Sequence, residues 1–209
     1  MPYAADHAAE TRRRIVESAR RLFNRKGFSE VSIDEIMAGA GLTRGGFYHH
    51  FKTKDELYAE AISVALTCDP VERISGTPLD PRQPADVVMR KMIEAYLSRR
   101  HLDNTDEHCA LFALPSDVAR ASSTVREAYQ NVLLALTQLF ERGLTGQGED
   151  DARCTALTVA SLCVGGMTLA NTVADERLAD EIRAAALVGA LKAAGVGGRT
   201  EPRRFDRAS

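Results

Sequence analysis

The spacing of apolar residues constrains the fold of this chain more than any other sequence feature. In the segment 11–26, apolar residues recur at helical intervals on one face (Ile15, Ala19, Leu22 and Phe23). No segment sustains the alternation of apolar and polar residues that is typical of a half-buried strand, and good helix formers are abundant. We therefore expect an all-α protein. Its 209 residues, 44% of them hydrophobic, suffice for one fair-sized domain or two unequal ones.

Start and stop signals divide the chain into about nine helices. The first, from Thr11 to Lys26, is expected to stop at Gly27. The second begins with a capping box, in which Glu35 follows Ser32 by three residues. The predicted helices after it are a third one capped by Thr43 and running to Phe51, a fourth capped by Thr53, and segments 85–100, 108–120, 123–143, 149–174 and 177–194. Pro115 is expected to bend or interrupt the sixth helix, and the proline-rich segment 69–84 is expected to be a long connection.

The first three helices lie within residues 12–51, and the tight turn Gly39-Ala40-Gly41 joins the second to the third. This spacing indicates a helix-turn-helix, whose last helix would enter the major groove of DNA. Charge agrees with this interpretation. Residues 1–54 carry 10 Lys and Arg against 6 Asp and Glu, a net charge of +4, whereas the remainder carries 17 against 23, a net charge of −6. A basic N-terminal part on an acidic body favours an anionic partner at one end.

The stretch "LTRGGFYHHFKTK" supplies the candidate DNA contacts. The hydroxyl and backbone N–H of Thr43 suit a phosphate, and the guanidinium of Arg44 suits a guanine. Gly45 and Gly46 have no side chains and would allow the helix to approach the DNA closely. Each glycine destabilises a helix by about 1 kcal/mol, so a short helix that contains two of them is expected to have a functional reason for them. Flanking phosphates would be contacted by Tyr48, His49, His50, Lys52 and Lys54. The alternative is a plain helix–helix corner with a solvated basic face.

The segment "SIDEIMAGAGLTRGGFYHHFKTKDEL" resembles the DNA-binding signature of tetracycline-repressor-type (TetR/AcrR) transcriptional regulators. The similarity covers about 45 residues, from Arg14 to Leu57. Its signature positions are Ser32, Ile33, Ile36, Ala40, Gly41, Thr43, Gly45, Phe47, Tyr48, His50, Phe51, Lys54 and Leu57. This chain has Phe47 where the family usually has leucine, and Gly46 where the family often has a larger residue. The resemblance adds Ser32 to the expected DNA contacts.

The resemblance implies a homodimer formed through the helices at 149–174 and 177–194, with small residues Ala160, Gly165 and Gly166 permitting close packing. It further implies a small-molecule pocket in the C-terminal domain and release of operator DNA when an inducer spreads the two recognition helices. We expect a DNA-binding domain at residues 1–54, a ligand-binding and dimerisation domain at 55–195, and a flexible tail at 196–209. The 20-residue charge-free run from Thr155 to Ala174 is then interpreted as a buried helix rather than a membrane span.

The expected pocket residues are apolar or semi-polar positions on the helices of the C-terminal domain: Met89, Met92, Ile93, Tyr96, Cys109, Phe112, Leu133 and Met167. Methionine and aromatic side chains suit a small apolar or aromatic inducer. Each of these residues could equally be ordinary core.

The cysteines offer a second hypothesis. None of Cys68, Cys109, Cys154 and Cys163 forms a CxxC pair, and the polar, acidic start of the chain is no secretory signal, which indicates the cytoplasm. The stretch "HCALFALPSDVAR" resembles a subset of the same family in which a cysteine opening the sixth helix senses electrophiles or oxidants. Cys109 is thus a candidate switch, with inert packing as the alternative.

Other functional classes find little support in the sequence. His101, His108 and Cys109, with the acids between them, match no familiar zinc spacing, so we expect a polar loop and no metal. There is no nucleophile motif or phosphate-binding loop, so we expect neither an enzyme nor a cofactor. The leading prediction is a repressor released by a small molecule; a thiol-based sensor on the same scaffold is the alternative.

Overall fold

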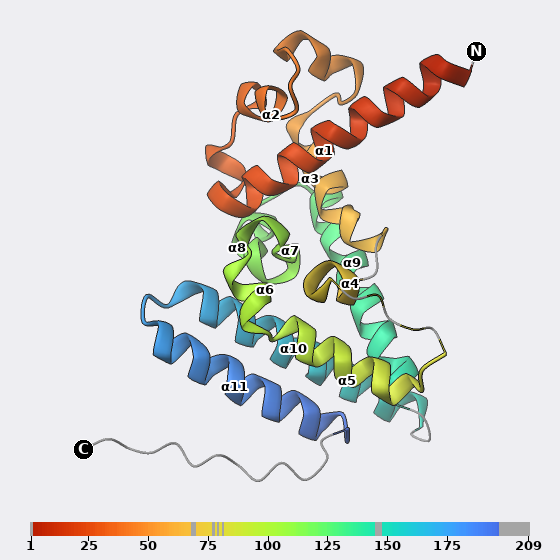
Figure 1. Cartoon of the computed structure of the whole chain (residues 1–209), viewed down its shortest axis with the longest axis vertical. Helices are drawn as coiled ribbons and strands as arrows, with labels where there is room; N and C mark the ends of the chain where they lie inside the picture. The colour runs from red at the N-terminus through yellow and green to blue at the C-terminus, as the bar shows by residue number, and fades with distance from the viewer. Residues whose placement is uncertain are drawn as a thin grey trace.

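The computed structural model describes residues 2–67, 70–76, 78, 80, 82–144 and 148–196. Every regular element within these residues is helical, which confirms the all-α prediction. Figure 1 shows a smaller N-terminal part, at the top, above a larger helical body. The elements are α1 Pro2–Glu30, α2 Ile33–Gly39, η1 Arg44–His49, α3 Lys54–Ser63, η2 Val64–Leu66, α4 Pro70–Ser75, α5 Ala85–Tyr96, α6 Arg99–Asp103, η3 Thr105–Glu107, α7 Ala110–Ala113, α8 Pro115–Ala119, α9 Ser123–Gly143, α10 Glu149–Thr172 and α11 Glu176–Ala193, where η denotes a 3₁₀ helix.

Local signals account for most helix ends in the N-terminal part. Gly27 interrupts α1 with φ 77° and ψ 172°, a conformation open essentially to glycine alone, so the predicted stop is confirmed. The capping box is confirmed as well, because Ser32 Oγ accepts from the Glu35 N–H at 3.1 Å and Glu35 Oε2 accepts from the Ser32 N–H at 3.0 Å. Thr53 caps α3 by accepting from the Glu56 N–H.

Two expectations about the third helix were wrong. Thr43 makes no side-chain capping bond, and the element that follows it is the 3₁₀ helix η1 rather than an α-helix reaching Phe51. Its first bond, from the Gly46 N–H to the Thr43 carbonyl, spans three residues at 3.0 Å. The two consecutive glycines explain the difference, because they stabilise an α-helix poorly.

The body contains more helices than expected, again for local reasons. The predicted helix 85–100 ends at Tyr96, because Ser98 starts α6 by accepting from the His101 N–H. Pro115 interrupts the predicted helix 108–120 and stands in the first turn of α8. A short helix, α4, forms within the expected connection. The predicted tail lies almost wholly outside the described residues.

The long helices α9, α10 and α11 build the body, with α11 on its outer side (Figure 1). Helix α3 packs against both α1 and α9, so it joins the two parts across the expected boundary at residue 54. Among the described helices, only α10 is long and apolar enough to span a membrane, yet it packs against α9 and α11. Its own chain buries 39% of its most apolar 18-residue window, which leaves one face of α10 uncovered.

Candidate DNA-binding surface and ligand cavity

The turn between α2 and η1 is held from both sides. Gly41 adopts φ 69°, which favours glycine, and the Leu42 N–H donates to the Met37 carbonyl at 2.8 Å. Arg14, on α1, donates from its guanidinium to the carbonyl of Ala40. Beyond the turn, Phe47 and Phe51 are buried and anchor the segment. The turn and η1 thus have a fixed orientation relative to α1 and α2.

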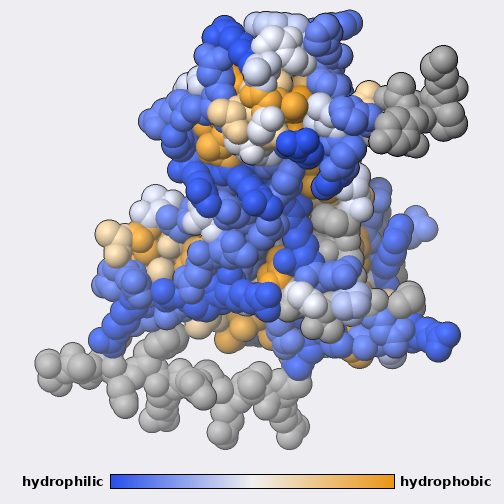
Figure 2. Space-filling model, turned by 45° about the horizontal axis from the view of Figure 1, so that its top comes forward, coloured by the Kyte–Doolittle hydropathy of each residue, from blue (hydrophilic) through white to orange (hydrophobic). Residues whose placement is uncertain are grey.

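Most of the expected DNA-contact residues share the outer surface of this segment. Ser32, Thr43, Arg44, Gly45, Tyr48, His49 and Lys52 are exposed, whereas Gly46, His50 and Lys54 are half-buried. Tyr48 stands out, with 62% of its surface exposed. In the face drawn in Figure 2, hydrophilic residues cover most of the molecule and hydrophobic residues show through in patches, one of them on the N-terminal part.

The two glycines of η1 occupy different environments. A Cβ added at Gly45 would meet no atom within 4 Å, so this position opens to solvent. A Cβ added at Gly46 would lie 3.4 Å from the Cε of Met37, on α2. Gly45 therefore fits the expectation of a bare surface for close approach. The absence of a side chain at Gly46 instead serves the packing of η1 on α2.

The basic residues also divide into two kinds. Arg44 pairs with Asp34 at 2.8 Å on the surface, whereas Lys52 is exposed and its ammonium has no ion-pair partner within the described residues. Lys54 donates its ammonium to the carbonyl of Phe28 and lies 4.2 Å from the centroid of that ring. Burial lowers the pKa of Lys54. In this conformation the Lys54 ammonium binds a backbone carbonyl near the C-terminal end of α1 and does not extend outward toward a phosphate.

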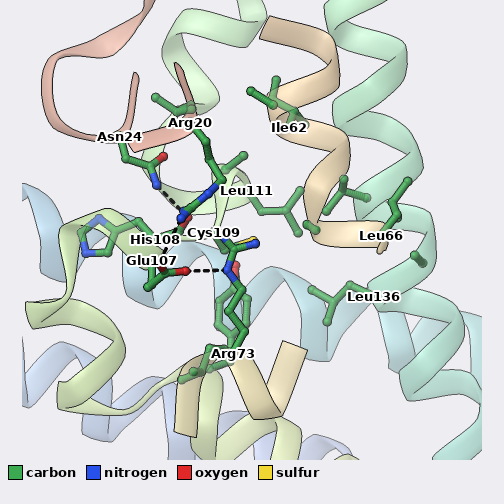
Figure 3. A pocket seen from close by; sticks show the side chains of 18 of the residues that line it. Arg20, Asn24, Ile62, Leu66, Arg73, Glu107, His108, Cys109, Leu111 and Leu136 are labelled. Carbon is green, nitrogen blue, oxygen red and sulfur yellow. Dashed lines mark hydrogen bonds and ion pairs between the residues drawn. The ribbon is translucent and has the colours of Figure 1, made fainter. Parts of the chain in front are cut away.

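A partly open cavity of about 220 Å³ lies between α1 and the helices of the body (Figure 3). Its lining comes from α1, α3, α5, α9 and the short segments between them: Arg20, Phe23, Asn24, Tyr58, Ala61, Ile62, Ala65, Leu66, Arg73, Ile74, Met92, Tyr96, His101, Glu107, His108, Cys109, Ala110, Leu111, Leu114, Val132, Ala135, Leu136 and Leu139. The cavity is mostly apolar, with a cluster of polar groups on one wall.

Three of the eight expected pocket residues, Met92, Tyr96 and Cys109, line this cavity. The other five do not. Met89, Ile93, Phe112 and Met167 are buried in the core, and Leu133 packs against it. Phe112, for example, is enclosed by the rings of Tyr96, His101 and His108. These helices carry apolar residues on more than one face, and sequence alone does not show which face borders an empty space.

Sequence reasoning missed the part of the wall that comes from α1 and α3. Arg20 is only 6% exposed and lies 3.0 Å from Glu107, which also pairs with Arg73 at 2.7 Å. Asn24 donates to the carbonyl of His108 at 3.0 Å. Figure 3 shows Arg20 and Asn24 pointing from α1 toward Glu107 and His108, with Arg73 approaching Glu107 from the other side. The sequence offered one signal for this part of the wall: Arg20 is a charged residue next to the apolar face of α1.

Buried titratable groups surround the polar wall. The Nδ1 atom of His101 lies 2.8 Å from the carbonyl oxygen of Tyr96, and burial lowers the pKa of His101 to about 4. Burial, reinforced by the Cys109 thiol, raises the pKa of Tyr96 well above its usual value. Cys109 is half-buried, whereas Cys163 is buried, which raises the pKa of its thiol to about 12. No group of three or more His, Cys, Asp or Glu side chains within the described residues is arranged to hold a metal ion.

The uncovered surfaces of α10 and α11 carry large apolar side chains. Leu157, Leu169, Leu178 and Val188 are 41%, 58%, 43% and 60% exposed. Gly165 also opens outward, because an added Cβ would meet nothing within 4 Å. Gly166 and Ala160 face inward instead. A Cβ at Gly166 would lie 2.5 Å from the Cβ of Ala186, so this glycine permits packing of α10 on α11 of the same chain.

The helix-turn-helix segment is similar in sequence to that of known bacterial regulatory proteins. Residues 15–61 match the family model described as bacterial regulatory proteins, tetR family. The HTH-type transcriptional regulator AcrR of Shigella flexneri is 49% identical over 53 residues, a quarter of each chain, so the alignment spans well under two thirds of that relative. The HTH-type transcriptional regulator TtgR of Pseudomonas putida is 26% identical over 74% of this chain and 77% of its own. The crystal structure of Escherichia coli NemR in reduced form has the same fold, with a TM-score of 0.67 and 18% identity over 88% of this chain and 96% of that one.

Proposed function

Because this chain belongs to the tetR family of bacterial regulatory proteins, we propose that it is a DNA-binding transcriptional regulator. The observation that carries the proposal is the exposed surface formed by η1 and by Lys52, three residues after its end. There Arg44, Tyr48, His49 and Lys52 lie together beyond a rigid glycine turn, within the segment that matches the family model. Side chains on such a surface reach base edges and phosphates at once.

We propose that the regulator acts as a homodimer through α10 and α11. The exposed leucines and valine on these helices support this, because a dimer interface would remove them from water. A two-fold dimer reads two half-sites about 34–36 Å apart, or a multiple of that spacing. Leu169→Glu should then yield a monomer in analytical ultracentrifugation, whereas Glu149→Gln, at an exposed position at the start of α10, should leave the dimer intact. A dimer that persists in Leu169→Glu would contradict this assignment.

The cavity is the proposed site of a small-molecule inducer. It adjoins α1 directly through Arg20 and Asn24, so an occupant that moves Glu107 or His108 also acts on the helix that carries the helix-turn-helix. A ligand releases DNA only if it binds the non-DNA-binding conformation more tightly. On this basis we infer a cytoplasmic repressor that leaves its operator when the cavity is filled.

The DNA-binding proposal is tested by selecting bound duplexes from a random library with the purified full chain. The selected duplexes should share two related half-sites. Arg44→Ala should weaken binding to them by roughly 1–3 kcal/mol, if this residue reads a guanine. The control is Arg82→Ala, an exposed arginine in the body. Wild-type affinity and specificity in Arg44→Ala would remove Arg44 from the reading surface, and a selection that recovers no shared sequence would overturn the function itself.

The second candidate function is thiol sensing by Cys109, which the position of this residue in the cavity wall favours. An electrophile that alkylates Cys109 would occupy the cavity covalently. Cys109→Ser should then abolish release of DNA by iodoacetamide. Cys154→Ser, which removes an exposed thiol on α10, should leave that release unchanged. Release that survives in Cys109→Ser would exclude Cys109 as the switch.

A further inference from the structure

Three residues that line the cavity each carry a buried polar group whose hydrogen-bonding capacity is not met by a strong partner. Within the described residues, the hydroxyl of Tyr58 and the Nε2 atom of His101 have no hydrogen-bond partner, and the hydroxyl of Tyr96 has none other than the Cys109 thiol. Their side chains are at most 2% exposed, and all three residues line the cavity. The Cys109 thiol, which neighbours the Tyr96 hydroxyl, is only a weak partner. An unmet buried polar group costs about 1–3 kcal/mol, so three such groups among the residues that line one cavity favour a ligand that supplies their partners.

The contact of His101 Nδ1 shows which nitrogen of the ring carries the proton. Nδ1 lies 2.8 Å from the carbonyl oxygen of Tyr96, which can only accept a hydrogen bond. Nδ1 therefore carries the proton, and in the neutral ring Nε2 is an acceptor. The phenol groups of Tyr58 and Tyr96 each offer an O–H donor and an acceptor oxygen. The wall is therefore matched by a group that donates one hydrogen bond and accepts another.

The charged residues of the cavity do not call for a charged occupant. Glu107 lies 3.0 Å from Arg20 and 2.7 Å from Arg73, and Arg20 also pairs with Glu17 at 2.7 Å. Glu17 in turn pairs with Arg21 at 2.7 Å, so each charged group of the cavity wall already has a counter-ion. A charged ligand would have to break these pairs or remain buried without a counter-ion, which is costly either way.

The rest of the cavity is apolar and small. Ile62, Leu66 and Leu136 lie at the end away from the ion pairs (Figure 3). The volume is about 220 Å³. Since an apolar protein cavity of roughly 150 Å³ accommodates benzene, this one accommodates one ring with a substituent, or two fused rings.

We propose that the cavity binds a neutral, hydroxyl-bearing compound of one or two rings, of the phenol class. Its O–H donates to His101 Nε2, its oxygen accepts from the hydroxyl of Tyr96 or Tyr58, and its rings lie among the aliphatic side chains. This assignment rests on the proposed function of the cavity as an inducer site and names the chemistry of that inducer. A hydrocarbon of the same shape would leave the three polar groups unmet.

The test measures direct binding to the purified full chain without DNA, by titration calorimetry with matched probes. 2-Naphthol should bind at least tenfold more tightly than naphthalene, since a tenfold ratio corresponds to about 1.4 kcal/mol, the worth of a single hydrogen bond. The anion 2-naphthoate and the cation 1-methylquinolinium should each bind at least tenfold more weakly than 2-naphthol. Equal affinity for naphthol and naphthalene, preference for either ion, or no binding of naphthol would each overturn the proposal.

Variants assign the preference to the named atoms. Tyr96→Phe keeps the ring and removes the hydroxyl, and His101→Leu removes the acceptor; each should reduce the ratio of naphthol to naphthalene affinity severalfold. Tyr129→Phe is the matched control, because the Tyr129 hydroxyl already donates to the Leu111 carbonyl at 2.7 Å and the residue does not line the cavity. Retention of the full ratio in both Tyr96→Phe and His101→Leu would refute the assignment. Because no DNA is present, naphthol that binds but releases no operator would contradict the proposed function alone.

Discussion

The guanidinium of Arg20, on α1, lies 3.0 Å from the carboxylate of Glu107, at the end of η3. This pair connects the helix that bears the helix-turn-helix to the wall of the cavity. Arg20 also donates to the Asp106 carbonyl, so the contact fixes both the backbone and a side chain of that segment. Because the Arg20 side chain is 7% exposed, water screens the interaction only weakly.

Replacing Glu107 tests what this connection contributes. Glu107→Gln removes one charge from a partly buried network, and we expect the free energy of unfolding to fall by about 1–3 kcal/mol. Urea denaturation measures this change. The control, Glu181→Gln, disrupts an exposed pair with Arg177 and should cost under about 0.5 kcal/mol. Equal losses in both variants would mean that the Arg20–Glu107 pair has no special role.

The neighbouring glycines of α10 should respond oppositely to an added methyl group. Gly166→Ala places a Cβ 2.5 Å from that of Ala186 and should destabilise the fold by about 1–3 kcal/mol through overpacking. Gly165→Ala meets open space within the chain and should stabilise the helix by up to about 1 kcal/mol. Thermal unfolding of the two variants compares them directly. A stabilised Gly166→Ala would show that α10 and α11 separate readily.

Lys52 and Lys54 should differ in their effect on DNA binding. Lys52→Ala removes an exposed cation and should lower the slope of log affinity against log salt by about one, equally for all sequences. Lys54→Ala removes a bond to the Phe28 carbonyl and should instead reduce the free energy of unfolding by about 1–2 kcal/mol. Salt titrations of operator binding and urea denaturation separate the two effects. The reverse pattern would make Lys54 the phosphate contact.

Acid should destabilise the protein through His101. Its pKa falls from 6.5 to about 4 on folding, chiefly because burial disfavours the charged ring, and burial lowers the pKa of His108 too. The unfolded chain thus binds more protons than the folded chain between these pH values. The contribution of neutral His101 to the free energy of unfolding is fully present above pH 6.5 and is lost as the pH falls to 4. The difference between the unfolded and folded pKa values of His101 corresponds to about 3 kcal/mol.

Urea denaturation across pH 7.5 to 4 measures this loss. The variant His101→Gln should flatten the curve, whereas His49→Gln, at an exposed position, should leave it unchanged. An equally steep curve in His101→Gln would assign the acid sensitivity to other groups.

The sequence by itself determined the features that depend on neighbours along the chain. The stop at Gly27, the capping box of Ser32 and Glu35, and the interruption at Pro115 all follow from residues a few positions apart. The helical class followed from periodicity, because a 3.6-residue repeat buries one face wherever the partner lies. The DNA-contact segment was recognised for the same reason, since its signature is contiguous.

Only the tertiary structure decided which faces meet and which leave a space. Gly45 and Gly46 are adjacent residues of the same type, yet Gly45 faces solvent and Gly46 faces Met37. Tyr58 and Arg20 reach the cavity because α3 packs between α1 and α9, a contact between segments distant in the chain. A cavity is a deficit of packing among several helices, so no local pattern encodes it. Its unmet hydroxyls and imidazole nitrogen, which define the proposed ligand, emerge only when those helices come together.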